Sequence, residues 1–121
     1  MVIFAKGIVA DRLTLQSGGV DALKISYRFN ADVHWKEIMK LRLDLAKEAE
    51  KKHPSPEIIG AKVLAMFELV FGSDCTKQIV EFFEDNLESL ITNLSPVFQR
   101  KIYPACEKAR KRAIKARKRA K

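Results

Sequence analysis

The chain has only two cysteines and lacks any apolar run long enough to cross a bilayer. Cys75 and Cys106 have no short spacing between them and no nearby histidine, so the sequence favours idle or buried thiols over a zinc site or a disulfide. No stretch approaches the ~20 apolar residues that a membrane span needs, and no cleavable signal precedes the first predicted strand. We therefore expect a cytosolic protein with no membrane segment.

Residue groupings that support catalysis are also lacking. His34 and His53 lie far apart in the sequence, and neither has a ligand-like partner at helical spacing. The glycines show no phosphate-binding spacing. Four carboxylates do cluster, but acids near helix ends are ordinary, and no base or nucleophile accompanies them. They are Glu81, Glu84, Asp85 and Glu88. We expect a non-enzymatic protein with no catalytic residue, no metal site and no cofactor.

Positive charge is concentrated at one end of the chain. The 121 residues carry 23 Lys and Arg against 15 Asp and Glu, a net charge of +8. Residues 108–121 hold nine of these cations and no acid, so the remaining 14 bases and 15 acids nearly cancel. The nine candidates for polyanion binding are Lys108, Arg110, Lys111, Arg112, Lys115, Arg117, Lys118, Arg119 and Lys121.

The first 30 residues indicate a β-hairpin. Apolar and polar residues alternate over 11–16 and 23–29, and Ser17-Gly18-Gly19 between them is a turn signal. The segment 2–4 is a candidate third strand, with Gly7 as a break. A hairpin alone is marginal in water, so its apolar face must rest on helices.

Two helices of different character follow. Residues 32–52 carry a single apolar stripe that includes Trp35, with charged residues such as Glu48 on the other faces. Residues 56–71 are apolar nearly all round, begin with the capping pair Ser55-Pro56 and end before Gly72. We expect this second helix to be central and covered on most sides. Gly60 within it suggests close approach of a neighbouring helix.

The last third of the chain predicts further helices. One spans about 74–84, and Ser95-Pro96 makes 87–94 and 97–120 either two helices or one kinked helix. The apolar stripe stops near Pro104, and Ile114 is the one sizeable apolar residue beyond it. We therefore predict an α+β fold with one globular domain over 1–107, made of a hairpin (1–30) packed on about four helices (32–104). Residues 108–121 are expected to form frayed helix or a disordered tail.

Aromatic residues are numerous for a domain of this size. They are more often core than interface, yet an exposed apolar patch would mark a site for a protein partner. The candidate partner-binding residues are Trp35, Phe67, Phe71, Phe82, Phe83 and Phe98.

The order of these segments resembles a known family. A hairpin ends in Tyr27–Asp32 (Tyr-Arg-Phe-Asn-Ala-Asp), a charged helix and a proline-serine break follow, and an apolar helix ends in Phe71-Gly72. Next come Thr76–Ile79 (Thr-Lys-Gln-Ile) and a last helix with a basic end. This resembles the short tail-assembly chaperones and tail components of long-tailed phages and prophages of Gram-positive bacteria. The chain departs from the family at 85–94, where such proteins often have a glycine-rich turn.

The resemblance implies a function without catalysis or cofactor. Such chaperones coat the long helical tape measure protein in the cytoplasm of the host cell and keep it soluble until the tail tube protein displaces them. It implies a homo-oligomer with the tape measure protein as partner. Two alternatives stay open: a small basic protein that contacts nucleic acid non-specifically through residues 108–121, and a structural tail component that remains in the particle.

Overall fold

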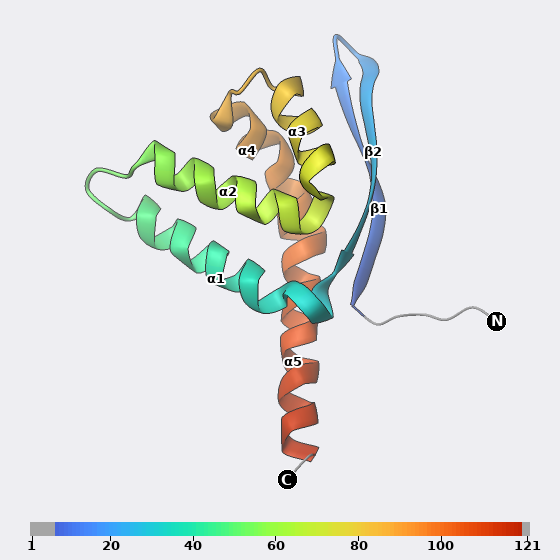
Figure 1. Ribbon diagram of the computed structural model, residues 1–121, viewed down its shortest axis with the longest axis vertical. Coiled ribbons are helices and arrows are strands. Elements are labelled where there is room, and N and C mark those ends of the chain that lie inside the picture. Colours follow the sequence, from blue (N-terminus) through green and yellow to red (C-terminus); the bar gives the residue numbers. More distant parts are fainter. Residues whose placement is uncertain (1–6, 120–121) are drawn as a thin grey trace, which may run out of the picture.

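The computed structural model describes residues 7–119, with side chains as far as residue 117. It is an α+β fold in which an N-terminal hairpin packs on helices, and this confirms the expected fold class. In Figure 1 the hairpin stands along one side of the helices, α1 and α2 are joined by a short turn, and α5 runs along the long axis. The elements are β1 (Ile8–Ser17), β2 (Val20–Asn30), α1 (Ala31–Ala49), α2 (Pro56–Phe71), α3 (Ser73–Phe82), α4 (Leu87–Val97), a π-helical turn (Phe98–Ile102) and α5 (Tyr103–Arg119).

The hairpin is longer than predicted and has one buried face. β1 and β2 pair antiparallel, with Leu13 opposite Ile25. Gly18 and Gly19 make the turn with φ of 60° and 82°, values that glycine adopts without steric cost. The buried face comes from alternate residues, because successive side chains of a strand point to opposite sides. It consists of Leu13, Leu15, Ile25, Tyr27 and Phe29. The candidate strand at 2–4 lies outside the described residues.

A buried carboxylate fixes the turn between α1 and α2. Glu48 is only 4% exposed, although the sequence pattern placed it on an outer face of the helix. Its carboxylate accepts a hydrogen bond from Lys51 Nζ at 2.9 Å and another from the Ser55 backbone N–H at 3.1 Å. The hydrogen bond from Lys51, followed by that from Ser55, lowers the pKa of Glu48 below its ordinary value of 4.5. Glu48 thus ties the last turn of α1 to the N-cap of α2.

α2 has the predicted boundaries but is enclosed over only part of its length. The Ser55 hydroxyl accepts a hydrogen bond from the Ile58 N–H at 3.3 Å, and Gly72 closes the helix with φ of 82°. Its buried side chains are Val63, Met66, Phe67, Val70 and Phe71. The first turns face solvent instead, with Ile58 43% exposed. Ala65 and Glu68 in the second half are exposed as well, so the expectation that α2 is covered on most sides holds only for the face that carries the buried side chains.

The corner between α3 and α4 replaces the glycine-rich turn of the resembled family. Glu84 and Asp85 have φ of 52° and 61°, the left-handed conformation that glycine usually supplies. The Asp85 N–H donates to the Val80 carbonyl at 3.1 Å, and this bond closes α3. The chain can therefore turn here without glycine, although non-glycine residues adopt this conformation at a steric cost.

α4, the π turn and α5 form one continuous helical run. Pro96 lies inside α4, and the helix passes through it, so the single-helix alternative is correct. In the π turn the Tyr103 N–H donates to the Phe98 carbonyl, five residues back. Pro104 follows directly and lacks an N–H, so the wider turn lies where the regular α-helical ladder has no donor.

The basic end of the chain is helical, and the first part of this helix packs against α1. α5 continues to Arg119 through the expected domain boundary at residue 107. Cys106 and Ala109 are 0% and 1% exposed, and α5 packs against α1. The Arg112 guanidinium pairs with Asp32 at 2.7 Å. Sequence reasoning required a large apolar residue for burial, whereas small residues suffice where two helices approach closely.

Candidate interaction surfaces

Three of the predicted partner-binding aromatics are core residues. Phe67, Phe71 and Phe98 are 3%, 6% and 4% exposed, so they offer no surface to a partner. The rings of Phe67 and Phe98 are stacked with centroids 5.2 Å apart, and Phe71 meets Tyr27 edge-on at 5.0 Å. These ring contacts hold β2, α2 and the π turn together.

The other three aromatics are half-buried, and Trp35 is on a different helix from Phe82 and Phe83. Trp35 is on α1, with the Lys36 ammonium 5.6 Å from its ring centroid. Phe82 and Phe83 meet edge-on at 5.1 Å at the end of α3. The structure therefore does not bring the six predicted residues together into one apolar patch.

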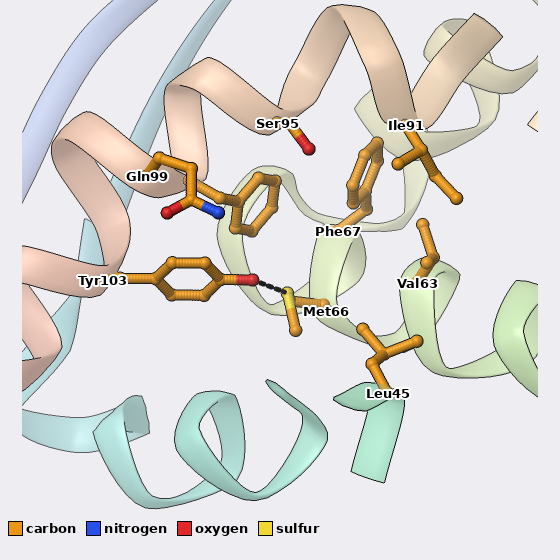
Figure 2. Close-up of a pocket in the computed structure, with 9 residues that line it drawn as sticks. Leu45, Val63, Met66, Phe67, Ile91, Ser95, Gln99 and Tyr103 are labelled. Carbon is orange, nitrogen blue, oxygen red and sulfur yellow. Dashed lines mark hydrogen bonds between the residues drawn. The ribbon is translucent and has the colours of Figure 1, made fainter. Parts of the chain in front are cut away.

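Figure 2 shows a small cavity between α1, α2 and the α4–α5 run. Its volume is about 90 Å³, and its lining includes Leu45, Met66 and Ile91. The Tyr103 hydroxyl points to the Met66 sulfur at 3.4 Å, and burial raises the pKa of that hydroxyl. Cavities that hold organic ligands usually exceed about 300 Å³. This one is a gap in the core packing.

A larger open groove of about 500 Å³ runs between α1 and α2. Its apolar lining comes from Leu41 on α1 and from Ala65 and Leu69 on α2. The charged lining carries both signs, and Lys62 pairs with Asp44 at 3.5 Å across the two helices. The charged lining residues are Glu37, Lys40, Asp44, Lys62 and Glu68. An apolar floor with a charged rim is the form of a groove that accepts an amphipathic helix.

The groove residues of each helix recur at helical spacing in the sequence, although none of them is among the predicted partner-binding residues. Residues 37, 40, 41 and 44 recur at three- and four-residue steps on α1, as do 62, 65 and 69 on α2. The predicted partner-binding residues are all large aromatics, so they do not include a groove floor of leucine and alanine. The side-by-side packing of the two helices creates the groove, and pairing of faces cannot be read from either stripe alone.

The predicted polyanion-binding cations of α5 divide into two groups. Arg112 pairs with Asp32, and Arg110 with Glu107 at 2.5 Å, so both are engaged within the chain. The Arg110 guanidinium lowers the pKa of Glu107 through their hydrogen bond. In the part of the chain that the structure describes, the remaining cations with described side chains have no ion pair and are exposed. Three of them lie on one side of α5 and are called the basic face: Lys108, Lys111 and Lys115. Arg117 lies on the opposite side of the helix from Lys108, at a hollow beside α1.

The remaining three cations are placed less completely. Lys118 and Arg119 lie on the last turn of α5, which extends past the described side chains, and Lys121 lies outside the described residues. The helix itself presents the basic face because residues three and four apart, such as Lys108, Lys111 and Lys115, share one side. Ala109 lies on the buried side, against α1. Cations near a helix C-terminus also interact favourably with the helix dipole, which helps α5 to remain helical.

The other reactive groups of the described residues offer little chemistry. Cys106 is fully buried, and burial raises its pKa to about 11, which disfavours the reactive thiolate. Among residues 7–119 no group of His, Cys, Asp and Glu is arranged to hold a metal ion. In the same range no helix is both long and apolar enough to cross a membrane. The interaction surfaces are therefore the features that point to a function.

Comparison with known proteins gives no match, whether the chain is set against family models, curated proteins or solved structures. The likeness to tail-assembly chaperones thus depends on the short motifs of the sequence. Of these motifs, Asn30 caps α1 by accepting a hydrogen bond from the Val33 N–H at 3.3 Å, and Gly72 ends α2. Both have local structural roles, so function must be inferred from the surfaces.

Proposed function

We propose that this protein binds a long helical partner in the groove between α1 and α2 and acts, without catalysis, as a chaperone of phage or prophage tail assembly. The partner is then the tape measure protein, as the resemblance implies. The observation that supports this best is the groove itself, whose volume is about 500 Å³ and whose floor is apolar. Neither the small core cavity nor the acidic cluster offers a comparable surface.

The groove lining matches the properties of such a partner. A helix with an apolar stripe can lay that stripe on Leu41, Ala65 and Leu69, because helix-in-groove recognition uses apolar anchors at three- and four-residue steps. Charges of both signs line the groove, so charged residues that flank the stripe find opposite partners. A long tape measure helix repeats such stripes, and many copies bound along it gain from avidity.

The proposed role implies where the protein acts and how it is released from its partner. The protein works in the cytoplasm of the host bacterium as repeated copies that cover apolar stripes of the tape measure protein. The tail tube protein then displaces these copies as the tube grows. A structural tail component would bind through the same groove and differ only by remaining in the finished particle. Mass spectrometry of purified tails separates the two roles.

A second candidate function rests on the basic face of α5. Its three exposed lysines form no ion pair within residues 7–119 and can contact phosphates, and such binding is insensitive to base sequence and weakens steeply with salt. Within residues 103–119 the one aromatic residue is Tyr103, which packs in the core cluster, so α5 offers no stacking platform for bases. Non-specific contact with nucleic acid is the form this candidate takes.

Co-expression with the tape measure protein of the same gene cluster tests the groove. Ala65→Arg fills the groove with a bulky charged side chain, and Ala61→Arg places the same side chain one turn earlier on α2, where the residue is exposed but does not line the groove. We expect Ala65→Arg to weaken binding by roughly tenfold or more and to leave the tape measure protein insoluble. Ala61→Arg should behave like the parent. Full solubility with both variants would exclude the groove as the binding site.

A further inference from the structure

Four exposed acidic residues lie close together at one corner of the molecule. Glu81, Glu84, Asp85 and Glu88 lie where α3 turns into α4, and all four are exposed. None of them forms an ion pair with any residue in the described range 7–119. We call this set the acidic corner. Phe82 and Phe83 add half-buried apolar surface between the carboxylates.

The opposite charge and a second apolar surface occur together on α5. Val33 and Ile114 are 63% and 38% exposed, and both line one hollow of about 300 Å³ between α1 and α5. The charged residues that line this hollow are Asp32, Lys36 and Arg117, and Asp32 is already paired with Arg112. Lys111 and Lys115 flank Ile114 on α5, so the hollow adjoins the basic face.

These two surfaces are too far apart to meet within one molecule. In Figure 1 the α3–α4 corner lies at one end of the long axis, and the C-terminal part of α5 projects at the other. Within the described residues neither set of charges forms ion pairs, although Arg110 and Arg112 on α5 do. Opposite charges therefore lie toward the two ends of the long axis of the molecule, each next to apolar surface.

We propose that copies of this protein associate head to tail, with the acidic corner of one copy docked on the basic face and the adjoining hollow of the next. The carboxylates meet Lys111 and Lys115, and apolar surface beside Phe82 and Phe83 covers Val33 and Ile114. Such a contact uses two different patches, so each copy keeps a free end, and the contacts close into a ring or continue as a filament. The inference concerns contacts between copies and holds whatever the client in the groove is.

Charge reversal tests this contact directly. One variant carries Glu81→Lys with Glu88→Lys, and the other carries Lys111→Glu with Lys115→Glu. Sedimentation over a concentration series measures their association at low and moderate salt. Each variant alone would meet like charge across the contact, so its apparent dissociation constant should rise on the order of tenfold or more. Their equimolar mixture should associate again, because each reversed end then meets an end of opposite charge.

A matched control separates this contact from a general effect of charge. Lys47→Glu with Lys52→Glu makes the same change in net charge as Lys111→Glu with Lys115→Glu, at exposed positions outside both patches, and it should associate like the parent. A monomeric parent, or a mixture that stays as dissociated as its two components, would overturn the proposal. Random-sequence duplex DNA provides a further arm. If Lys111→Glu with Lys115→Glu abolishes DNA binding and leaves self-association unchanged, the basic face serves polyanions and the proposal is wrong.

Discussion

α2 and α5 are helices of similar length, with 16 and 17 residues, yet they are held in the fold in different ways. α2 inserts large side chains such as Phe67 and Phe71 into an aromatic cluster shared with β2 and the π turn. α5 buries small side chains, Cys106 and Ala109, against α1, and Arg112 reaches Asp32 at the same junction. α2 is stabilised by the burial of large side chains, and α5 by its close approach to α1.

This difference shows which helix faces can carry charged residues while the helix stays packed in the fold. A helix that buries a narrow stripe of small residues leaves most of its circumference free, so α5 can carry a face of unpaired cations and remain ordered. α2 cannot do so on its inner face, because Phe67 and Phe71 there are enclosed by large neighbours. The surfaces proposed for function accordingly lie on α5, on the acidic corner and on the exposed sides of α1 and α2.

Removal of volume from α2 should have the largest effect. Phe67→Ala deletes a ring that is 3% exposed and that stacks on Phe98, so unfolding should become easier by about 3–5 kcal/mol through lost burial and a residual cavity. Urea denaturation followed by circular dichroism measures the change. A loss below about 1 kcal/mol would mean that α2 is not held by its aromatic residues.

Addition of volume to α5 should also lower stability, but by less. Ala109→Leu forces a larger side chain between α5 and α1, which should lower stability by about 1–3 kcal/mol because overpacked helices must move apart. Ala116→Leu makes the same change at an exposed position of α5 and should lie within about 0.5 kcal/mol of the parent. Equal stability of the two variants would show that α5 is not closely packed.

The buried carboxylate at the α1–α2 turn predicts a smaller, pH-dependent loss. Because the pKa of Glu48 is lowered in the folded state, the unfolded chain binds more protons, so this stabilisation is present above about pH 4.5 and disappears as the pH falls through the lower, folded value. Glu48→Gln should remove that part of the dependence of the melting temperature on pH. Glu50→Gln, at a neighbouring exposed position, should retain it. Parallel pH curves for all three proteins would contradict the role of Glu48.

The smallest effect should be a gain, and it corrects one sequence expectation. Gly60 does not mark close approach of a helix, because an added Cβ would meet only Leu87 Cδ2 at 3.6 Å, an ordinary contact. Gly60→Ala should therefore raise stability by up to about 1 kcal/mol. Gly72→Ala should lower it, since φ there is +82°. Thermal melts of the two variants should shift in opposite directions.

Most of the fold could be predicted from local sequence signals. The Gly18-Gly19 turn, the Ser55-Pro56 cap and the Gly72 stop each act over a few residues, so they can be read without knowledge of neighbours. The packing of α5 could not be predicted in this way, because Cys106 and Ala109 have small side chains that do not stand out as an apolar stripe. Their burial depends on α1 lying close by, which is a property of the tertiary structure.

The candidate surfaces were predictable only in part. The cations of α5 stand out in the composition, but which of them are neutralised depends on partners such as Asp32, 80 residues earlier in the chain. The aromatic candidates were chosen by size, and size favoured burial for Phe67, Phe71 and Phe98. The α1–α2 groove arises from the contact of two helices, so neither helix reveals it alone.

Chemical-shift mapping by NMR, at a concentration at which the chain stays monomeric, tests the central claim most directly, since a monomer of 13.8 kDa gives well-resolved spectra. A helical segment of the tape measure protein is added to the labelled chain, and the residues whose signals move are identified. The proposed function predicts shifts around Leu41, Ala65 and Leu69, with few changes near Lys111 and Lys115. Shifts confined to the basic face of α5, with the groove signals unmoved, would contradict it.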